Sequence, residues 1–179
     1  MSDRQKLEVI FQKHGYSDFK WIDPKEFVVA PWVRMKCMFG CNEYGRTASC
    51  PPNVPSVEEC QKYFHDYNEA AIFHFTKAVE KPEDRRDWTR DLNRKLLDLE
   101  KDVFTSGYEK AFLLFLDSCG ICKSCRPTRG ECKEPKLSRP TPEALAMDVF
   151  STVRKVGYSI EVLCDYSQEM NRFAFLLIK

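Results

Sequence analysis

Apolar residues recur along this chain at two spacings, one typical of helices and one typical of strands. Stretches with an apolar residue every three or four positions predict helices, and caps or closing glycines bound them. Short, mostly apolar runs predict strands. The predicted helices cover residues 2–14, 56–67, 84–106 and 141–156, and the predicted strands cover residues 19–22, 27–33, 70–76, 110–116, 158–164 and 172–178.

The order of these segments predicts the fold class. A strand, a long helix and a second strand follow one another over residues 70–116, and a helix and two strands follow later. Such alternation is typical of βαβ crossovers. We therefore predict an α/β fold, with α+β as the alternative, in which a mixed β-sheet has helices packed against it. Residues 165–171 are expected to connect the last two strands.

Composition and charge are those of an ordinary globular protein and exclude several classes. Hydrophobic residues make up 43% of the chain and charged residues 31%, and the formal net charge is +1. No long basic run with interleaved aromatic residues is present, so we expect no nucleic-acid partner. The first residues lack the pattern of a signal peptide, and no apolar run is long enough to span a bilayer. We expect a cytoplasmic protein without a membrane partner, of unknown oligomeric state.

Nine cysteines are present, and their clustering points to metal chemistry. In a reducing cytoplasm, clustered cysteines are more often metal ligands or catalysts than disulfides. One segment carries three thiols at two-residue gaps and a fourth soon after, at Cys119, Cys122, Cys125 and Cys132. Bacterial ferredoxins use this C-x2-C-x2-C spacing to hold a [4Fe–4S] cluster, whereas zinc sites usually show two separated pairs. The spacing favours iron–sulfur, with Zn²⁺ as the alternative.

A second group of cysteines lies earlier in the chain, at Cys37, Cys41 and Cys50. Gly40 and Gly45 permit tight turns here, and two prolines follow the third cysteine. Cysteines in such a segment have little core to pack into, because it shows no apolar periodicity. We predict a loop that holds these three thiolates around a metal.

The remaining two cysteines fall on apolar faces. Seven cysteines, an odd number, are then left as candidate ligands. Cys60 lies on the stripe of a predicted helix and Cys164 alternates with apolar residues of a predicted strand, so both are interpreted as core residues. Two [4Fe–4S] clusters need eight ligands, and the loops supply seven cysteines. The eighth ligand would be Cys60, or an oxygen of Asp117 or Glu43; alternatively one iron stays open.

The second cysteine loop is rich in cations. Its basic residues are Lys123, Arg126, Arg129, Lys133, Lys136 and Arg139. Positive charge stabilises an anionic thiolate cluster and also steers acidic partners or anionic substrates. We expect a redox partner protein, such as an acidic ferredoxin or a flavoprotein.

Several motifs together make the chain similar to a known family. They are Arg34-Met-Lys-Cys37-Met-Phe-Gly-Cys41, Tyr44-Gly45, Cys50-Pro51-Pro52, Cys119-Gly-Ile-Cys122-Lys-Ser-Cys125 with Cys132, Arg139-Pro140, Glu143-Ala144 and Asp148-Val149. Over most of its length the chain resembles the predicted metal-binding proteins called domain of unknown function 2284 (DUF2284). The resemblance implies metal binding, with iron–sulfur chemistry favoured, in anaerobic bacteria and archaea. It implies no substrate.

These observations lead to one prediction of function and two alternatives. We predict an iron–sulfur protein with one or two [4Fe–4S] clusters that works in electron transfer or as a redox accessory protein. One alternative is an enzyme whose three-cysteine cluster binds substrate at an open iron. First candidates for its proton transfer or substrate positioning are Glu43, Tyr44, Arg46 and Asp117. The other alternative is a zinc-binding structural or interaction module.

The predicted domain organisation follows from chain length and from the two loops. A chain of 179 residues is long enough for one domain with a core. We predict a single metal-binding domain over residues 1–179, with an N-terminal helix, strands and first cysteine loop in residues 1–56, and an α/β core in residues 57–179 that contains the second cysteine loop, residues 117–139.

Overall fold

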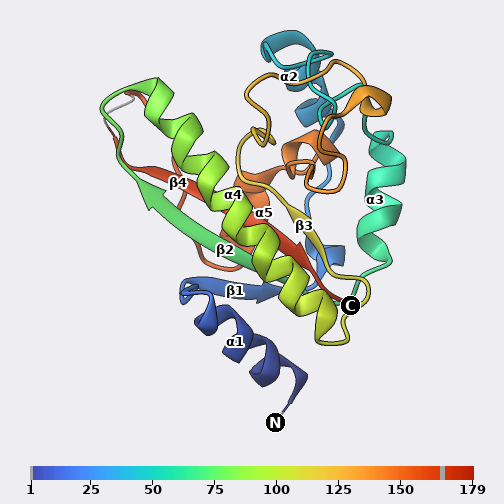
Figure 1. Cartoon of the computed structure of the whole chain (residues 1–179), viewed down its shortest axis with the longest axis vertical. Helices are drawn as coiled ribbons and strands as arrows, with labels where there is room; N and C mark the ends of the chain where they lie inside the picture. The colour runs from blue at the N-terminus through green and yellow to red at the C-terminus, as the bar shows by residue number, and fades with distance from the viewer. Residues whose placement is uncertain (1, 166–167) are drawn as a thin grey trace.

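The computed structural model describes residues 2–165 and 168–179. Within them an antiparallel sheet of four strands runs through the centre, in the order β1-β2-β4-β3 (Figure 1). The strands are β1 (Phe19–Ile22), β2 (Ala70–Lys77), β3 (Phe112–Leu114) and β4 (Met170–Leu177). Every residue of β2 pairs with a residue of β4, so these two strands form the backbone of the sheet.

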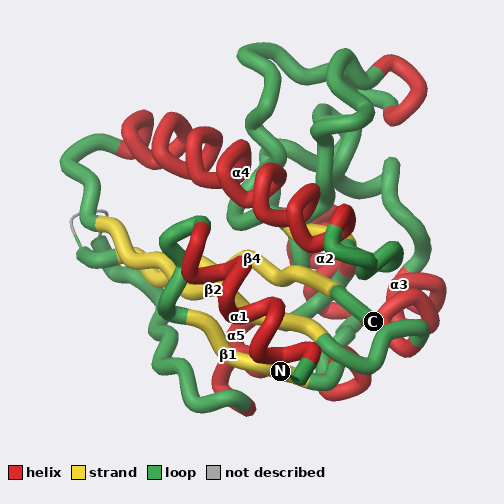
Figure 2. Tube along the Cα trace, turned by 60° about the horizontal axis from the view of Figure 1, so that its bottom comes forward, coloured by secondary structure: helices red, strands yellow, loops and turns green. Residues whose placement is uncertain are grey.

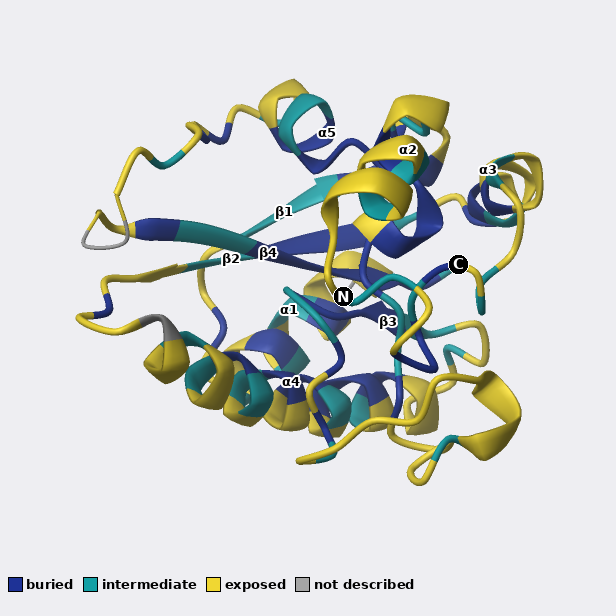
Figure 3. Cartoon of the chain, turned by 90° about the horizontal axis from the view of Figure 1, so that it is seen from above, coloured by how far each residue is buried: buried dark blue, intermediate teal, exposed yellow. Residues whose placement is uncertain are grey.

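Helices cover both faces of the sheet. They are α1 (Asp3–Lys13), α2 (Pro31–Gly40), α3 (Val57–His65), α4 (Pro82–Thr105) and α5 (Val149–Lys155). Helices α1 and α4 lie on one face, and α2, α3 and α5 lie on the other (Figure 3). Because strand side chains alternate between faces, Phe73 packs in the core cluster of α1 and α4, whereas its neighbour Ile72 packs in that of α3 and α5.

The prediction of strands and helices joined in one α/β architecture is confirmed, and the sheet takes the α+β form. All neighbouring strands run antiparallel. Strands β2 and β3 both run antiparallel to β4 and are therefore parallel to each other, so the predicted β2–α4–β3 crossover exists with β4 inserted between its strands. The order of elements along a chain does not reveal such an insertion, because the inserted strand comes last in the sequence.

The predicted strand over residues 27–33 is wrong. One isolated bridge, between Val29 and Met147, is all the strand pairing found in the described part of this segment, and α2 begins at Pro31. Proline suits the first turn of a helix, where a missing N–H costs nothing. Cys37 therefore lies on a helix and Cys41 caps it, rather than both lying in a loop.

The segment after the second cysteine loop also differs from its prediction. The predicted helix over 141–156 forms as two pieces, a 3-10 helix over Glu143–Leu145 and α5, because Ala146 adopts a left-handed conformation (φ 62°) between them and Asp148 then caps the new helix. The predicted strand over 158–164 is absent, since both sides of β4 are already paired. Residues 166–167 of the predicted connection lie outside the described residues. None of the described helices is long and apolar enough to cross a membrane.

Candidate metal centre

Each of the two cysteine groups lines a cavity of its own. Cys37, Cys41 and Cys50 line a cavity of about 430 Å³, here called the first thiol cavity. The four cysteines of the second loop line another of about 600 Å³, the second thiol cavity. The seven cysteines predicted as ligands thus line two cavities, three in the first and four in the second.

The two thiol cavities adjoin. Four residues line both of them: Glu43, Arg86, Thr89 and Ser118. The cysteine loops also contact each other directly, because the Ala48 N–H donates to the sulfur of Cys125 (3.5 Å) and the Asn53 amide donates to the Pro127 carbonyl (2.6 Å). Figure 1 shows both loops at the end of the molecule that carries α2. Two metal centres here would be neighbours.

The thiols within each group influence one another electrostatically. Burial raises the pKa of the Cys50 thiol to about 11, and the nearby Cys41 and Cys37 thiols add to the rise. The pKa of Cys122 is raised by desolvation first and then by Cys119 and the other cysteines of its loop. The raised pKa values of Cys50 and Cys122 favour the protonated thiols in the metal-free protein, and a bound metal would displace those protons.

Helix α4 holds the start of the second cysteine loop. Asp117, three residues after the end of β3, accepts hydrogen bonds from Arg85 at both carboxylate oxygens and from Nε of Arg172 on β4 (3.0 Å). The buried Asn93 amide donates to the Leu116 carbonyl (3.1 Å). Asp117 has a positive φ of 54°, a conformation that aspartate tolerates better than most residues, and this turn directs the chain into the thiol cavities.

Helix α4 also holds the far end of the same loop. The Glu100 carboxylate, only 7% exposed, receives a bidentate pair of hydrogen bonds from Arg139. The same carboxylate accepts the N–H of Leu113 on β3 (2.8 Å). Glu100 thus joins a helix, a strand and the end of the cysteine loop.

The sequence analysis does not identify these polar residues of α4, because the charged face of a helix is most simply interpreted as solvated surface. Arg85 and Arg94 bond to the cysteine loop, and Thr89 and Asn93 are buried. Their signal is a helical spacing: Arg85, Thr89 and Asn93 recur every four residues beside the leucine stripe. A polar row at that spacing, bordering an apolar one, indicates a second buried contact.

The two cysteines outside the groups have different surroundings. Cys60 is 1% exposed and packs in the core cluster of α3, with its thiol directed at the Pro55 carbonyl (3.6 Å). It lines neither thiol cavity. The interpretation of Cys164 as a core residue is wrong, because its strand does not form and its side chain is exposed.

The candidates for an oxygen ligand or for proton transfer occupy different positions relative to the thiol cavities. Glu43 lines both thiol cavities and forms an ion pair with Arg86 (3.3 Å). Tyr44 lines the first thiol cavity. Asp117 is held by its two arginines and acts as a brace of the loop. Arg46 is exposed and lines neither thiol cavity.

The donor set fits a metal centre by its chemistry. Thiolates are strong ligands for zinc and for iron–sulfur clusters, and four of them share one cavity. Within residues 2–165 and 168–179, no group of three or more cysteine, histidine or acidic side chains already stands in a metal-binding arrangement. Cys119, Cys122, Cys125 and Cys132 would hold one centre, and Cys37, Cys41 and Cys50 a second, once their thiols converge.

The fold and its two groups of thiols define the class: a small, cysteine-rich α+β protein with the ligands of a metal-binding protein. A comparison with protein families agrees, since the family described as predicted metal-binding protein (DUF2284) matches residues 20–178. The chain belongs to that family. No curated protein and no solved structure matches it.

Proposed function

We propose that this protein binds [4Fe–4S] clusters, one at each cysteine group when fully loaded, and transfers electrons through them. The observation that carries this proposal is the placement of seven cysteines around two adjoining cavities. Neighbouring clusters suit electron transfer, because an electron can pass from one to the other within the same small protein.

Two further features favour iron–sulfur over zinc. The second loop has the serial C-x2-C-x2-C spacing of ferredoxins, and the Ala48 N–H donates to one of its sulfurs, as hydrogen bonds commonly do around such clusters. The basic residues Lys123, Arg126, Arg129, Lys133 and Lys136 are all exposed around this loop. Their charge would offset that of an anionic cluster.

The first group favours a second candidate function, an open iron that binds substrate. It has three cysteines, and the buried Cys60 lies apart from its cavity. The fourth iron of a cluster would then carry either the Glu43 carboxylate, which lines the same cavity, or an exogenous molecule. In that case the second cluster would supply electrons to the first.

Metal and sulfide content of anaerobically purified protein tests the proposal. We expect about eight irons and eight labile sulfides per chain, with a broad visible band that dithionite bleaches. About four of each would leave one group without a cluster. Tightly bound zinc without labile sulfide would contradict the electron-transfer function and support the zinc-binding module instead.

We further propose that an acidic redox protein, a ferredoxin or a flavoprotein, docks on α2. Four large apolar side chains of this helix are exposed, Trp32, Met35, Met38 and Phe39, with Phe39 at 77%. The helix carries no acidic residue and bears the exposed Lys36, whereas Arg34 donates to the Pro55 and Ala144 carbonyls. An apolar patch with positive charge complements an acidic partner, and Cys37 on the same helix would bring the first cluster close to it.

Reversing this complementarity is expected to slow electron exchange. In Phe39→Asp, the rate constant for reduction by an acidic [2Fe–2S] ferredoxin at low salt should fall about tenfold, equivalent to about 1.4 kcal/mol. The matched control is Val9→Asp, which places the same charge at a residue of α1 that is 56% exposed. Stopped-flow rates that are equal in both variants would remove α2 as the docking site.

A further inference from the structure

Asn53 lies between the two cysteine loops and donates hydrogen bonds to both. Its side-chain amide donates to the Thr47 carbonyl of the first loop (3.1 Å) and to the Pro127 carbonyl of the second (2.6 Å). Its backbone N–H donates to the carbonyl of Cys50 (2.9 Å). One residue thus connects the backbone at a predicted ligand of the first group with the backbone two residues beyond Cys125, a predicted ligand of the second.

A second contact between the loops reaches a predicted ligand directly. The Ala48 N–H donates to the sulfur of Cys125 (3.5 Å). Ala48 is only 1% exposed, and its neighbours Thr47 and Ser49 are also buried. Thr47 lines the second thiol cavity although it belongs to the first loop. The first loop therefore forms part of the wall around the second group of thiols.

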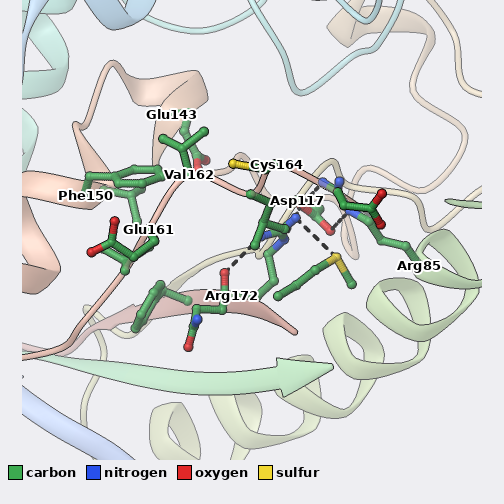
Figure 4. A pocket seen from close by; sticks show the side chains of 15 residues that line it. Arg85, Asp117, Glu143, Phe150, Glu161, Val162, Cys164 and Arg172 are labelled. Atoms are coloured by element: carbon green, nitrogen blue, oxygen red, sulfur yellow. Dashed lines mark hydrogen bonds and ion pairs between the residues drawn. The ribbon is translucent and has the colours of Figure 1, made fainter. Parts of the chain in front are cut away.

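The middle of the second loop depends on these contacts more than its ends do. The start of the loop is fixed by Asp117, which lies between Arg85 and Arg172 in the lining of a further cavity (Figure 4), and its end is fixed through Glu100. Residues 123–131 are all exposed, and both loops are irregular over most of their length, as the green segments of Figure 2 show. Among hydrogen bonds between described residues, those that tie this middle part to other parts of the protein come from the first loop.

Metal binding would order both loops, and the contacts between them link the two events. Within the described chain no three thiols already stand at metal-binding positions, so a metal has to draw each group together, and ordering a loop costs conformational entropy. A loop that its neighbour already holds loses less entropy. In addition, the sulfur of a metal-bound cysteine is anionic, which strengthens the hydrogen bond from Ala48 to Cys125. A filled second group would therefore hold the first loop more firmly.

We propose that Asn53 is a positioning residue that couples the two metal centres, so that filling one cysteine group raises the metal affinity of the other. The inference rests on the proposed function in that both groups bind metal, and it adds that half-loaded chains are disfavoured. A chain with a single cluster could not pass an electron between the groups. We expect a coupling factor of about ten, which is usual for linked sites and leaves either group able to bind metal alone.

Anaerobic titration of the metal-free, reduced protein with Co²⁺ measures the coupling. Cobalt bound by thiolates absorbs visible light, and sites with three and with four thiolates differ in their bands. The Kd of the second group should be about tenfold larger in Cys37→Ala, whose first group is incomplete, than in the unchanged protein. Because coupling is reciprocal, Cys122→Ala should raise the Kd of the first group by the same factor. Unchanged or tighter binding in these variants would overturn the proposal.

The variant Asn53→Leu tests whether this residue carries the coupling. Leucine has a similar size and cannot donate, so the tenfold effect of Cys37→Ala should shrink to less than about twofold when both proteins also carry Asn53→Leu. Asn42→Leu makes the same replacement at an exposed asparagine of the first loop and should keep the tenfold effect. A merely structural loss would weaken binding in both backgrounds equally. An effect of Cys37→Ala that stays tenfold in Asn53→Leu would therefore overturn the role of Asn53.

Failure of this inference and failure of the cluster proposal give different results. Cobalt binding reports on the thiols, whichever metal the purified protein carries. Two cobalt ions that bind without coupling would overturn the inference and leave the cluster proposal intact. Zinc without labile sulfide in the purified protein would contradict the cluster proposal, and the coupling would still be seen with cobalt. A chain that binds cobalt at neither group would contradict both.

Discussion

Replacing Cys122 by alanine is expected to remove one metal centre and to leave the other in place. Cys122 shares the second thiol cavity with three cysteines, and the first thiol cavity has its own group. Iron and labile sulfide should fall by about half, to about four of each per chain. Cys37→Ala should produce the same loss from the other group. Metal analysis of the anaerobically purified variants measures both.

The two cysteines outside the groups are the matched controls. Cys60→Ala and Cys164→Ala should keep the full metal content, because Cys60 packs in the core and Cys164 lines neither thiol cavity. A cluster lost in Cys60→Ala would show that this residue completes the first group, against its position in the structure. Loss of all iron in Cys122→Ala would show that the seven cysteines hold one centre rather than two.

Replacing Glu100 by alanine is expected to lower the free energy of unfolding by about 3–5 kcal/mol, the usual cost of removing one partner of a buried ion pair. The change leaves Arg139 without its carboxylate and the Leu113 N–H without its acceptor. Because Arg139 ends the second cysteine loop, the variant should also retain less metal at that loop. Urea unfolding followed by circular dichroism measures the first effect.

The neighbouring Lys101→Ala is the control for this experiment. Lys101 is exposed on the same helix, and its replacement should change stability by no more than about 0.5 kcal/mol. A double variant, Glu100→Met with Arg139→Leu, should recover part of the loss, because neither charge is then buried alone. A Glu100→Ala protein as stable as the Lys101→Ala control would contradict the role of this pair.

Elements with strong local signals were predictable from the sequence. The capping box at Ser56 begins α3 as expected, and the apolar runs near residues 72 and 175 form the paired central strands. Both signals act within a few residues of the chain. The prediction of two cysteine ligand groups rests on equally local signals, since three or four thiols in one short segment can reach a common point whatever the rest of the chain does.

Long-range contacts decided the rest. Pro31 begins a helix and not a strand, and residues 158–164 form no strand because β2 and β3 already pair with both sides of β4. A segment in which apolar and polar residues alternate can form a strand or remain irregular. The segments that pack against it determine which of the two occurs. Likewise, the sequence shows Arg85 and Glu100 only as charged residues of a helix, and such residues usually lie on its solvated face.

The sequence by itself therefore determined the helix caps, the central strands and the cysteine spacing on which the proposed metal chemistry rests, because each depends on residues close in the chain. Only the tertiary structure decided that α4 holds both ends of the second cysteine loop, through Arg85 and Glu100. It also decided that the two thiol cavities adjoin. Those relations depend on which segments pack together, and burial of the two core clusters on either side of the sheet brings those segments into contact.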